Sequence, residues 1–101
     1  MTNWKEGDYG YTMRFIFLNP LGVPINITNG SVIVRCKLGG KLRKYNGTIE
    51  DGANGVAILV LPEGLLSQSG KLQAQAQAIT DDGKFTSDII EEDIDELLGS
   101  A

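Results

Sequence analysis

Few side chains in this sequence could do chemistry. There is no histidine and only one cysteine, Cys36. A reactive thiol usually needs a neighbouring base or positive charge that lowers its pKa, and histidine commonly has this role. Cys36 instead alternates with Val32, Val34 and Leu38 in "SVIVRCKL", a pattern that predicts a buried, unreactive thiol on one face of a strand. A single cysteine also excludes an internal disulfide.

The carboxylates offer one other possibility, a cation site. Asp81 and Asp82, with Asp51, could supply oxygen ligands to calcium. A calcium loop needs about six to eight oxygens, and these aspartates lack the required spacing, so turn formation is the preferred interpretation. The sequence also has no glycine-rich phosphate loop after a predicted strand. We therefore expect no enzyme, no cofactor and no metal site.

Charge is distributed unevenly along the chain. Residues 88–101 contain six acidic side chains and no basic one, whereas residues 1–87 contain nine basic and seven acidic ones. The acidic end argues against nucleic acid as the main partner. A basic cluster could bind an acidic surface, including the acidic tail of the same or a neighbouring copy, or could be an ordinary solvated face. The cluster consists of Arg35, Lys37, Lys41, Arg43 and Lys44.

The elements that must position these side chains are predicted to be strands. Turn signals such as Asn-Gly and Asp-Gly recur at short intervals, and the runs between them have strand length. "YTMRFIFL" (11–18) and "GVAILVLP" (55–62) are apolar on both faces and predict interior strands. "SVIVRCKL" predicts one buried and one solvated face. Pro24 limits residues 23–27 to a short edge strand or a kinked extension, and a weaker pair of strands flanks Asn46-Gly47.

The stretch "GKLQAQAQAIT", residues 70–80, is ambiguous. Alanine and glutamine favour helix, but the strict alternation of Leu72 and three alanines with polar residues favours a strand. A helix of this length would have only a narrow apolar stripe to offset costly nucleation. We therefore predict a strand, whose small inward side chains leave room for bulky ones from a facing sheet.

The pattern changes after "KFTSDII". Ile90, Ile94, Leu97 and Leu98 have the i, i+4, i+7, i+8 spacing of a helical face, with acidic residues in the first turns and Gly99 as a stop. The sequence thus predicts an all-β domain of about seven strands over residues 1–90 and a short acidic helix over residues 91–101. We expect the apolar face of the helix to dock on a surface rimmed by the basic cluster.

The bulk properties fit one small domain. The chain has 101 residues, of which 42% are hydrophobic, enough for one compact core. No apolar run approaches the ~20 residues of a membrane-spanning helix. The start "MTNWKEGDYG" lacks the basic and apolar regions of a secretory signal, so we expect synthesis in a cytoplasm.

Several motifs occur in an order that resembles that of a known protein family. They are "GDYG", "FLNPLGVPINIT", "SVIVRCKL", a Gly-led strand ending in "LP", and "SGKLQAQAQAITDDGKFTS". Over residues 6–90 this order resembles the N-terminal domain of phage baseplate upper proteins, whose opening Gly-Asp-x-Gly is matched by Gly7, Asp8 and Gly10. Two departures are Leu72, where the family has Tyr, and the end at Ala101, without the helical and receptor-binding regions that usually follow.

The resemblance implies an immunoglobulin-like antiparallel β-sandwich that fastens other proteins to a phage tail. We expect a phage or prophage virion structural protein, an adaptor or decoration on a tail baseplate, fibre or capsid. It would be a homo-oligomer or be present in many copies, bound to other virion proteins without nucleic acid or membrane; contact with the host surface stays open. The alternative is a free-standing module that binds cell-wall carbohydrate, for which Trp4, Tyr9 and Tyr11 are the only aromatic cluster.

Overall fold

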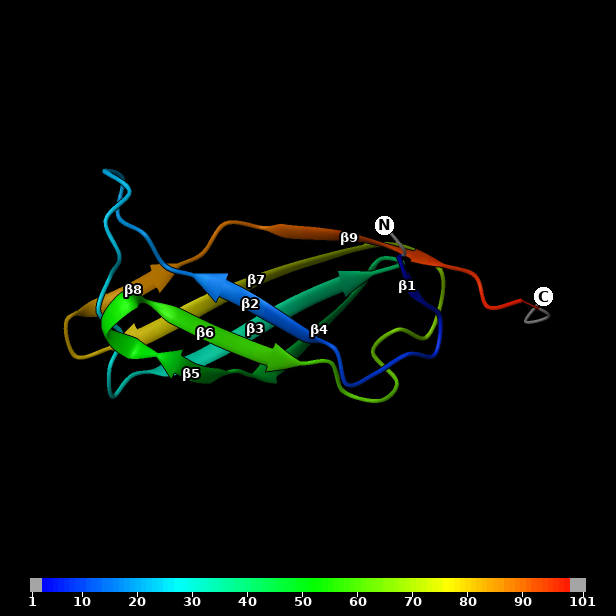
Figure 1. Cartoon of the computed structure of the whole chain (residues 1–101), viewed down its shortest axis with the longest axis horizontal. Helices are drawn as coiled ribbons and strands as arrows, with labels where there is room; N and C mark the ends of the chain where they lie inside the picture. The colour runs from blue at the N-terminus through cyan, green and yellow to red at the C-terminus, as the bar shows by residue number, and fades with distance from the viewer. Residues whose placement is uncertain (1–2, 99–101) are drawn as a thin grey trace.

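The computed structural model describes residues 3–98, which form nine strands in two sheets (Figure 1). The larger sheet has the order β1 (Trp4–Lys5), β9 (Ile90–Asp95), β7 (Gly70–Thr80), β3 (Ser31–Leu38) and β4 (Lys41–Asn46), and β8 (Gly83–Thr86) also pairs with β7. The smaller sheet has the order β2 (Thr12–Ile16), β6 (Val56–Val60) and β5 (Thr48–Asp51), and a 3-10 turn spans Gly52–Asn54. All pairs are antiparallel except β1–β9, which is parallel.

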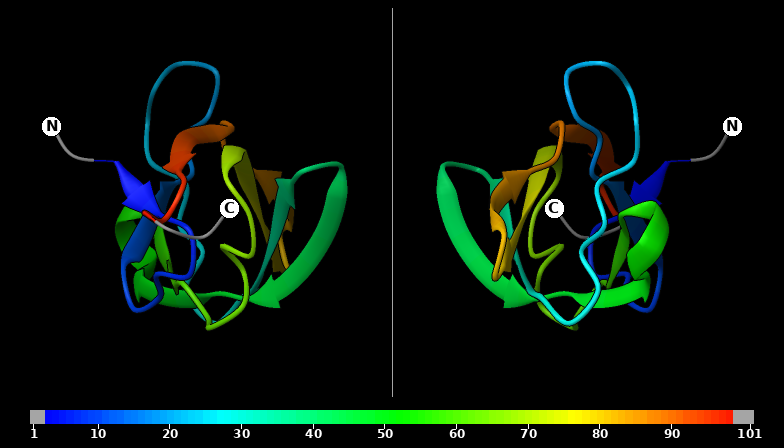
Figure 2. Two further views of the ribbon diagram at one scale, coloured as in Figure 1. Left: turned by 90° about the vertical axis from the view of Figure 1, so that its right-hand side faces the viewer. Right: turned by 90° about the vertical axis from the view of Figure 1, so that its left-hand side faces the viewer.

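The two sheets face each other across one apolar core (Figure 2). Phe15 and Phe17 on one side, and Val34 and Leu72 on the other, are almost completely buried. The prediction of an all-β protein is confirmed. Within the described residues, no helix has the length and apolar character needed to cross a membrane.

Residues 70–80 form the longest strand, β7, with the bounds that the sequence predicts. Leu72, Ala74, Ala76 and Ala78 are each at most 1% exposed, while the glutamines between them are only half-buried on the other face. Burial of alternate side chains against a second sheet outweighs the helix propensity of alanine and glutamine. The predicted strand is confirmed.

The chain crosses from one sheet to the other at Gly47. Its backbone N–H donates to the carbonyl of Val32 at 2.9 Å, and a Cβ at this position would lie 2.8 Å from Cγ1 of Val32. Only glycine fits so close an approach without a shift of its neighbours. The predicted strands on either side of Asn46-Gly47 are therefore present, but β4 and β5 belong to different sheets. Their continuous run joins the two layers along one side of the molecule (Figure 2).

The C-terminal helix prediction is wrong for residues 90–95, which form strand β9 between β7 and β1. Ile90 and Ile94 are four residues apart, and this spacing places them on one face of either a helix or a strand. The free edge of β7 supplies main-chain partners that decide between the two. Ile94 lies in the core and Ile90 packs against it, but Leu97 and Leu98 are exposed. Gly99, the predicted stop, lies outside the described residues.

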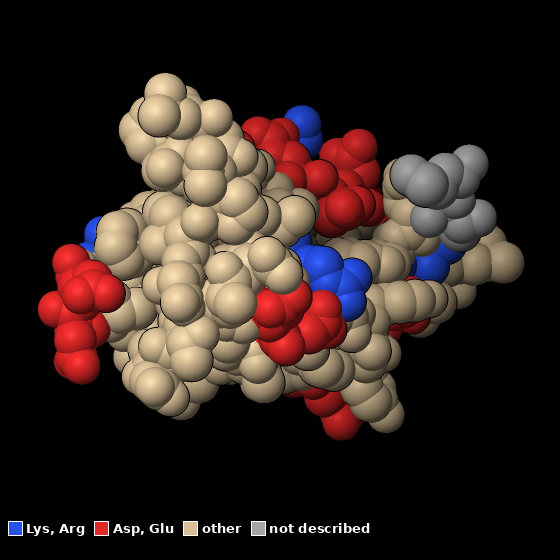
Figure 3. Space-filling view, turned by 60° about the vertical axis from the view of Figure 1, so that its left-hand side comes forward, with Lys and Arg blue, Asp and Glu red and all other residues tan. Residues whose placement is uncertain are grey.

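The two strands predicted to be interior, β2 and β6, have different positions in the smaller sheet. β6 is central in the smaller sheet, but β2 lies at its edge, so that prediction is wrong for β2. The outward side chains of these strands include Ile16 and Val60, each more than half exposed. Figure 3 shows part of this side as a broad area in which charged side chains are few. The apolar residues of β2 and β6 predicted that both faces of these strands are covered. Their outward face, however, is not covered by any described segment.

The strand assignment at the C-terminus predicts unequal effects of two truncations. We expect Ile94→Ala to lower the free energy of unfolding by about 2–5 kcal/mol, because it removes a buried side chain. Leu98→Ala should change it by less than about 0.5 kcal/mol, because Leu98 is fully exposed. Urea unfolding measures both values, and equal effects of the two substitutions would contradict the placement of β9.

Candidate interaction surface

The structure divides the predicted basic cluster between two faces. Residues opposite each other in an antiparallel pair share a face, and Arg35 lies opposite Lys44, whereas the inward Cys36 lies opposite Arg43. Arg35, Lys37 and Lys44 therefore lie on the outer face of the larger sheet. Lys41 and Arg43 lie on the side of the core, at its rim.

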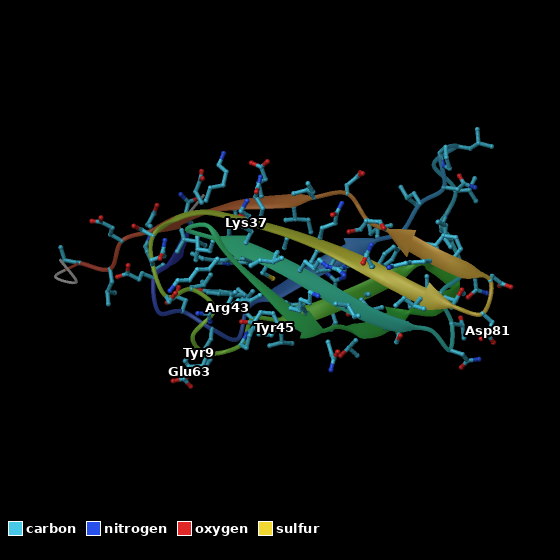
Figure 4. All side chains as sticks on the ribbon, turned by 180° about the vertical axis from the view of Figure 1, so that it is seen from behind. Tyr9, Lys37, Arg43, Tyr45, Glu63 and Asp81 are labelled. Carbon is cyan, nitrogen blue, oxygen red and sulfur yellow. The ribbon has the colours of Figure 1, made fainter. Side chains whose placement is uncertain are left out.

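Arg43 has a structural contact there, since its Nη1 donates to the carbonyl of Gly64 in the β6–β7 connection at 3.1 Å. Figure 4 shows Arg43 well apart from Lys37. β4 is also an edge strand, and lysine or arginine on an edge discourages pairing with other chains. This protective role accounts for the basic residues of β4 that do not join the outer face.

The outer face of the larger sheet carries three parallel bands. The register places Lys37 opposite Gln73, and Gln73 opposite Glu91. Two strand spacings, about 10 Å, thus separate the basic and acidic backbones. The basic band consists of Arg35, Lys37 and Lys44; the amide band of Gln73, Gln75 and Gln77, with Lys71 at its end; and the acidic band of Glu91 and Asp93, of which Asp93 lies opposite Lys71.

Hydrogen bonds order part of this face. Arg35 donates to the side-chain oxygen of Gln77, and the Nε2 of Gln73 lies 3.5 Å from Oε1 of Glu91. Lys71 forms an ion pair with Glu91 at 3.3 Å. Both side chains of that pair are about half exposed, so it contributes little stability. Within residues 3–98, Lys37, Lys44 and Asp93 form no ion pair, so both outer bands keep charge for a partner.

A shallow groove of about 170 Å³ lies on the same face. Its lining includes Arg35, Lys37 and Gln75, together with Leu42 and Ile89, which are 59% and 55% exposed. Exposed apolar side chains beside polar and charged ones occur together at surfaces that pack against another protein.

The four apolar residues of the predicted docking stripe do not come together with the basic cluster. Ile94 is buried, Ile90 is half-buried, and Leu97 and Leu98 follow the end of β9. What sequence reasoning missed is the outward row on β9, where Glu91 lies opposite Gln73 and Asp93 lies opposite Lys71 on β7. The alternation of Ile90, Glu92 and Ile94 with the outward acids is the signal that could have found it.

The other residues considered for chemistry are dispersed. The described residues contain no group of three or more His, Cys, Asp and Glu side chains that could hold a metal. Asp81 lies in the β7–β8 turn, at the opposite end of the molecule from Tyr9 (Figure 4). Trp4 and Tyr11 stack on each other, with centroids 5.4 Å apart and planes at 15°. The rings therefore cover each other, and only their outer faces could receive a sugar.

No protein-family model matches this chain, and no curated protein matches it at a significant level.

Cys36 is 1% exposed, so the prediction that it is buried is confirmed, and burial raises the pKa of its thiol from 9.0 to about 11. We expect thiol reagents to label the native protein far more slowly than the denatured protein, because the reactive thiolate is both scarce and shielded. Labelling at the same rate in both states would contradict this placement.

The raised pKa also predicts how stability depends on pH. The native state holds the Cys36 proton more tightly than the unfolded state, so this stabilisation is fully present below pH 9.0 and is lost as the pH rises toward about 11. Urea unfolding of the wild type should lose stability over this range faster than Cys36→Ala, which has no thiol to ionise. Parallel alkaline profiles would contradict the prediction.

Proposed function

We propose that this chain is a phage or prophage virion structural protein. It is a small immunoglobulin-like adaptor or decoration module that works by surface complementarity rather than catalysis. The observation that carries the proposal is the banded outer face of the larger sheet, where Lys37 and Glu91 present opposite charges on either side of Gln73, and Asp93 extends the acidic side. The order of motifs over residues 6–90 supports the assignment to a virion, and the two facing sheets support the immunoglobulin-like topology.

The banded face is complementary to itself. A two-fold axis that lies between two facing sheets, parallel to β7 and over the glutamine row, would place the basic band of one copy over the acidic band of the other. The glutamines would then meet at the axis, where each amide group can both donate and accept hydrogen bonds. Leu42 and Ile89 would add apolar contacts at the groove. Such a contact would join copies of a module that repeats on a particle.

This arrangement also favours the adaptor over the carbohydrate-binding alternative. A sugar-binding face normally presents open aromatic rings, and Trp4 and Tyr11 cover each other on one side. On the outer face of the larger sheet, charged residues outnumber aromatic ones. Complementary charges mainly increase the specificity and the association rate of binding between proteins.

The self-complementary face predicts that two charge reversals cancel each other. Lys37→Glu alone and Asp93→Lys alone should each abolish self-association, because each puts like charges opposite one another. An equimolar mixture should associate again, since each mismatch then meets its opposite. Analytical ultracentrifugation at low and high salt measures this, and wild-type association should weaken as salt screens the bands.

Both variants stay net negative, because the wild type carries a formal charge of −4, so non-specific attraction cannot restore association in the mixture. Leu97→Lys, an exposed substitution beyond β9, provides the control that should associate like the wild type. If neither reversal changes the association, the banded face is not the contact between copies.

The virion assignment has its own test. Prophage induction of the source bacterium, followed by density purification of the particles, should leave the chain bound to them. Antibody labelling in electron micrographs should then mark one discrete position on tail or capsid. If the chain stays in the soluble fraction of a lysate that contains intact particles, the virion assignment is wrong.

A further inference from the structure

The four edges of the two sheets are protected unequally. Free edges usually carry charged side chains that prevent pairing with other chains. On β2 the only charged side chain is Arg14, and both its Nε and its Nη2 donate to the carboxylate of Glu50, at 2.9 and 3.0 Å. β2 therefore has no charge left to guard its edge. Among the other edges, β4 carries Lys41, Arg43 and Lys44, β5 carries Asp51, and the part of β9 that β1 leaves unpaired carries Glu91, Glu92 and Asp93.

The free edge of β2 also presents main-chain groups. The carbonyl of Tyr11 accepts from Leu61, and the N–H of Phe17 donates to Gly55, so the odd-numbered residues of this segment face β6. Because bonding alternates along an antiparallel pair, the N–H and C=O groups of Thr12, Arg14 and Ile16 point away from β6. No main-chain hydrogen bond joins these groups to another described residue.

A groove of about 280 Å³ runs beside this edge, with Ile16 and Leu18 on one wall and Asp88 and Ile90 on the other. It exists because the strand opposite breaks at Ser87. The N–H of Ser87 donates to the carbonyl of Ala76 at 2.9 Å, and the Ser87 Oγ accepts from the N–H of Ala76 at 3.0 Å. These bonds hold Ser87 against β7 between the end of β8 and the start of β9.

The surroundings of the groove favour a single extended strand, rather than a second folded domain, as its occupant. Residues 18–23 project from the body of the molecule at the end of β2 (Figure 2). Asn19 holds this projection, since its Oδ1 accepts from the N–H groups of Leu21 and Val23 at 2.9 and 3.0 Å. A second copy that approached β2 edge-on would meet this loop, whereas an extended segment can lie alongside it.

We propose that the edge of β2 from Thr12 to Leu18 accepts an extended segment of a partner protein as a fourth strand of the smaller sheet. Main-chain hydrogen bonds to Thr12, Arg14 and Ile16 would provide affinity, and alternate apolar side chains beside Ile16 and Leu18 would provide specificity. Arg14 is already neutralised by Glu50, while Asp88 forms no ion pair within the described residues. The segment therefore alternates apolar and polar residues and carries a lysine or arginine opposite Asp88.

The probe is a set of capped heptapeptides, Lys-Xaa-Thr-Xaa-Thr-Xaa-Thr, with valine, isoleucine, leucine or phenylalanine at Xaa. They are added to the ¹⁵N-labelled full chain up to millimolar concentration. For the best of them we expect hydrogen exchange of the Thr12, Arg14 and Ile16 amides to slow about tenfold once free peptide is about ten times its Kd. The amides of Gln73 and Gln75, on the other sheet, should keep their rates. The same peptide N-methylated at the residues that face β2 should not bind.

A pair of lysine variants provides the matched control. Ile16→Lys adds a charge at the free edge and should weaken binding about tenfold, whereas Val60→Lys adds the same charge on the same face, on the central strand β6, and should leave binding unchanged. Both positions are about half exposed, so both variants should keep the wild-type melting temperature, which a thermal scan verifies.

Four results would overturn the proposal. Three are the absence of any peptide effect at millimolar concentration, equal binding by the N-methylated peptide, and equal weakening by the two lysine variants. Protection of the Thr12, Arg14 and Ile16 amides that rises with protein concentration alone would identify a second copy as the occupant, and would also overturn it. None of these results bears on the banded face, which lies on the other sheet and is tested by Lys37→Glu and Asp93→Lys.

Discussion

The antiparallel ladder between β3 and β7 determines both the core and the outer surface of the larger sheet. Its register places Val32, Val34 and Cys36 opposite Ala78, Ala76 and Ala74. Successive side chains point to opposite faces, so a slip of one residue would bury the glutamines if β7 moved, or Arg35 and Lys37 if β3 moved. The pairing of large with small inward residues also leaves space for Phe15 and Phe17 in the core. The banded outer face is the other half of the same alternation.

The neighbours of β3 and of β7 extend this ladder in different ways. On one flank, Gly47 lets the run from β4 to β5 pass between the sheets and close that side. On the other flank, the chain contacts β7 twice, as β8 and β9, and Ser87 fills the position between them. That interruption leaves the edge of β2 open beside a groove. One molecule thus has a polar face suited to a second copy and an apolar edge suited to an extended segment.

The sequence was most informative where one face of a strand is buried. Alternation alone predicted β7 with its correct bounds, as well as the buried Cys36. It failed at the C-terminus because Ile90 and Ile94 share a face in either a helix or a strand, and the free edge of β7 that decides between them is a tertiary feature. The basic cluster was predicted as one unit because five basic residues are close in sequence, and the pleat then separates Arg43 from Lys44. The edge position of β2 depends on sheet order, which its local apolar pattern does not encode.

The register of β3 against β7 is the most direct test of this account. In nuclear Overhauser spectra of the labelled chain, we expect interstrand contacts between the backbone protons of Arg35 and Gln75, and between those of Lys37 and Gln73. Contacts of Arg35 with Ala74 or Ala76 at the directly opposite position would place either Arg35 in the core or the alanines on the outer face. Medium-range contacts between Leu72 and Ala76 would indicate a helix. Either result would contradict the positions of both the core and the charged bands.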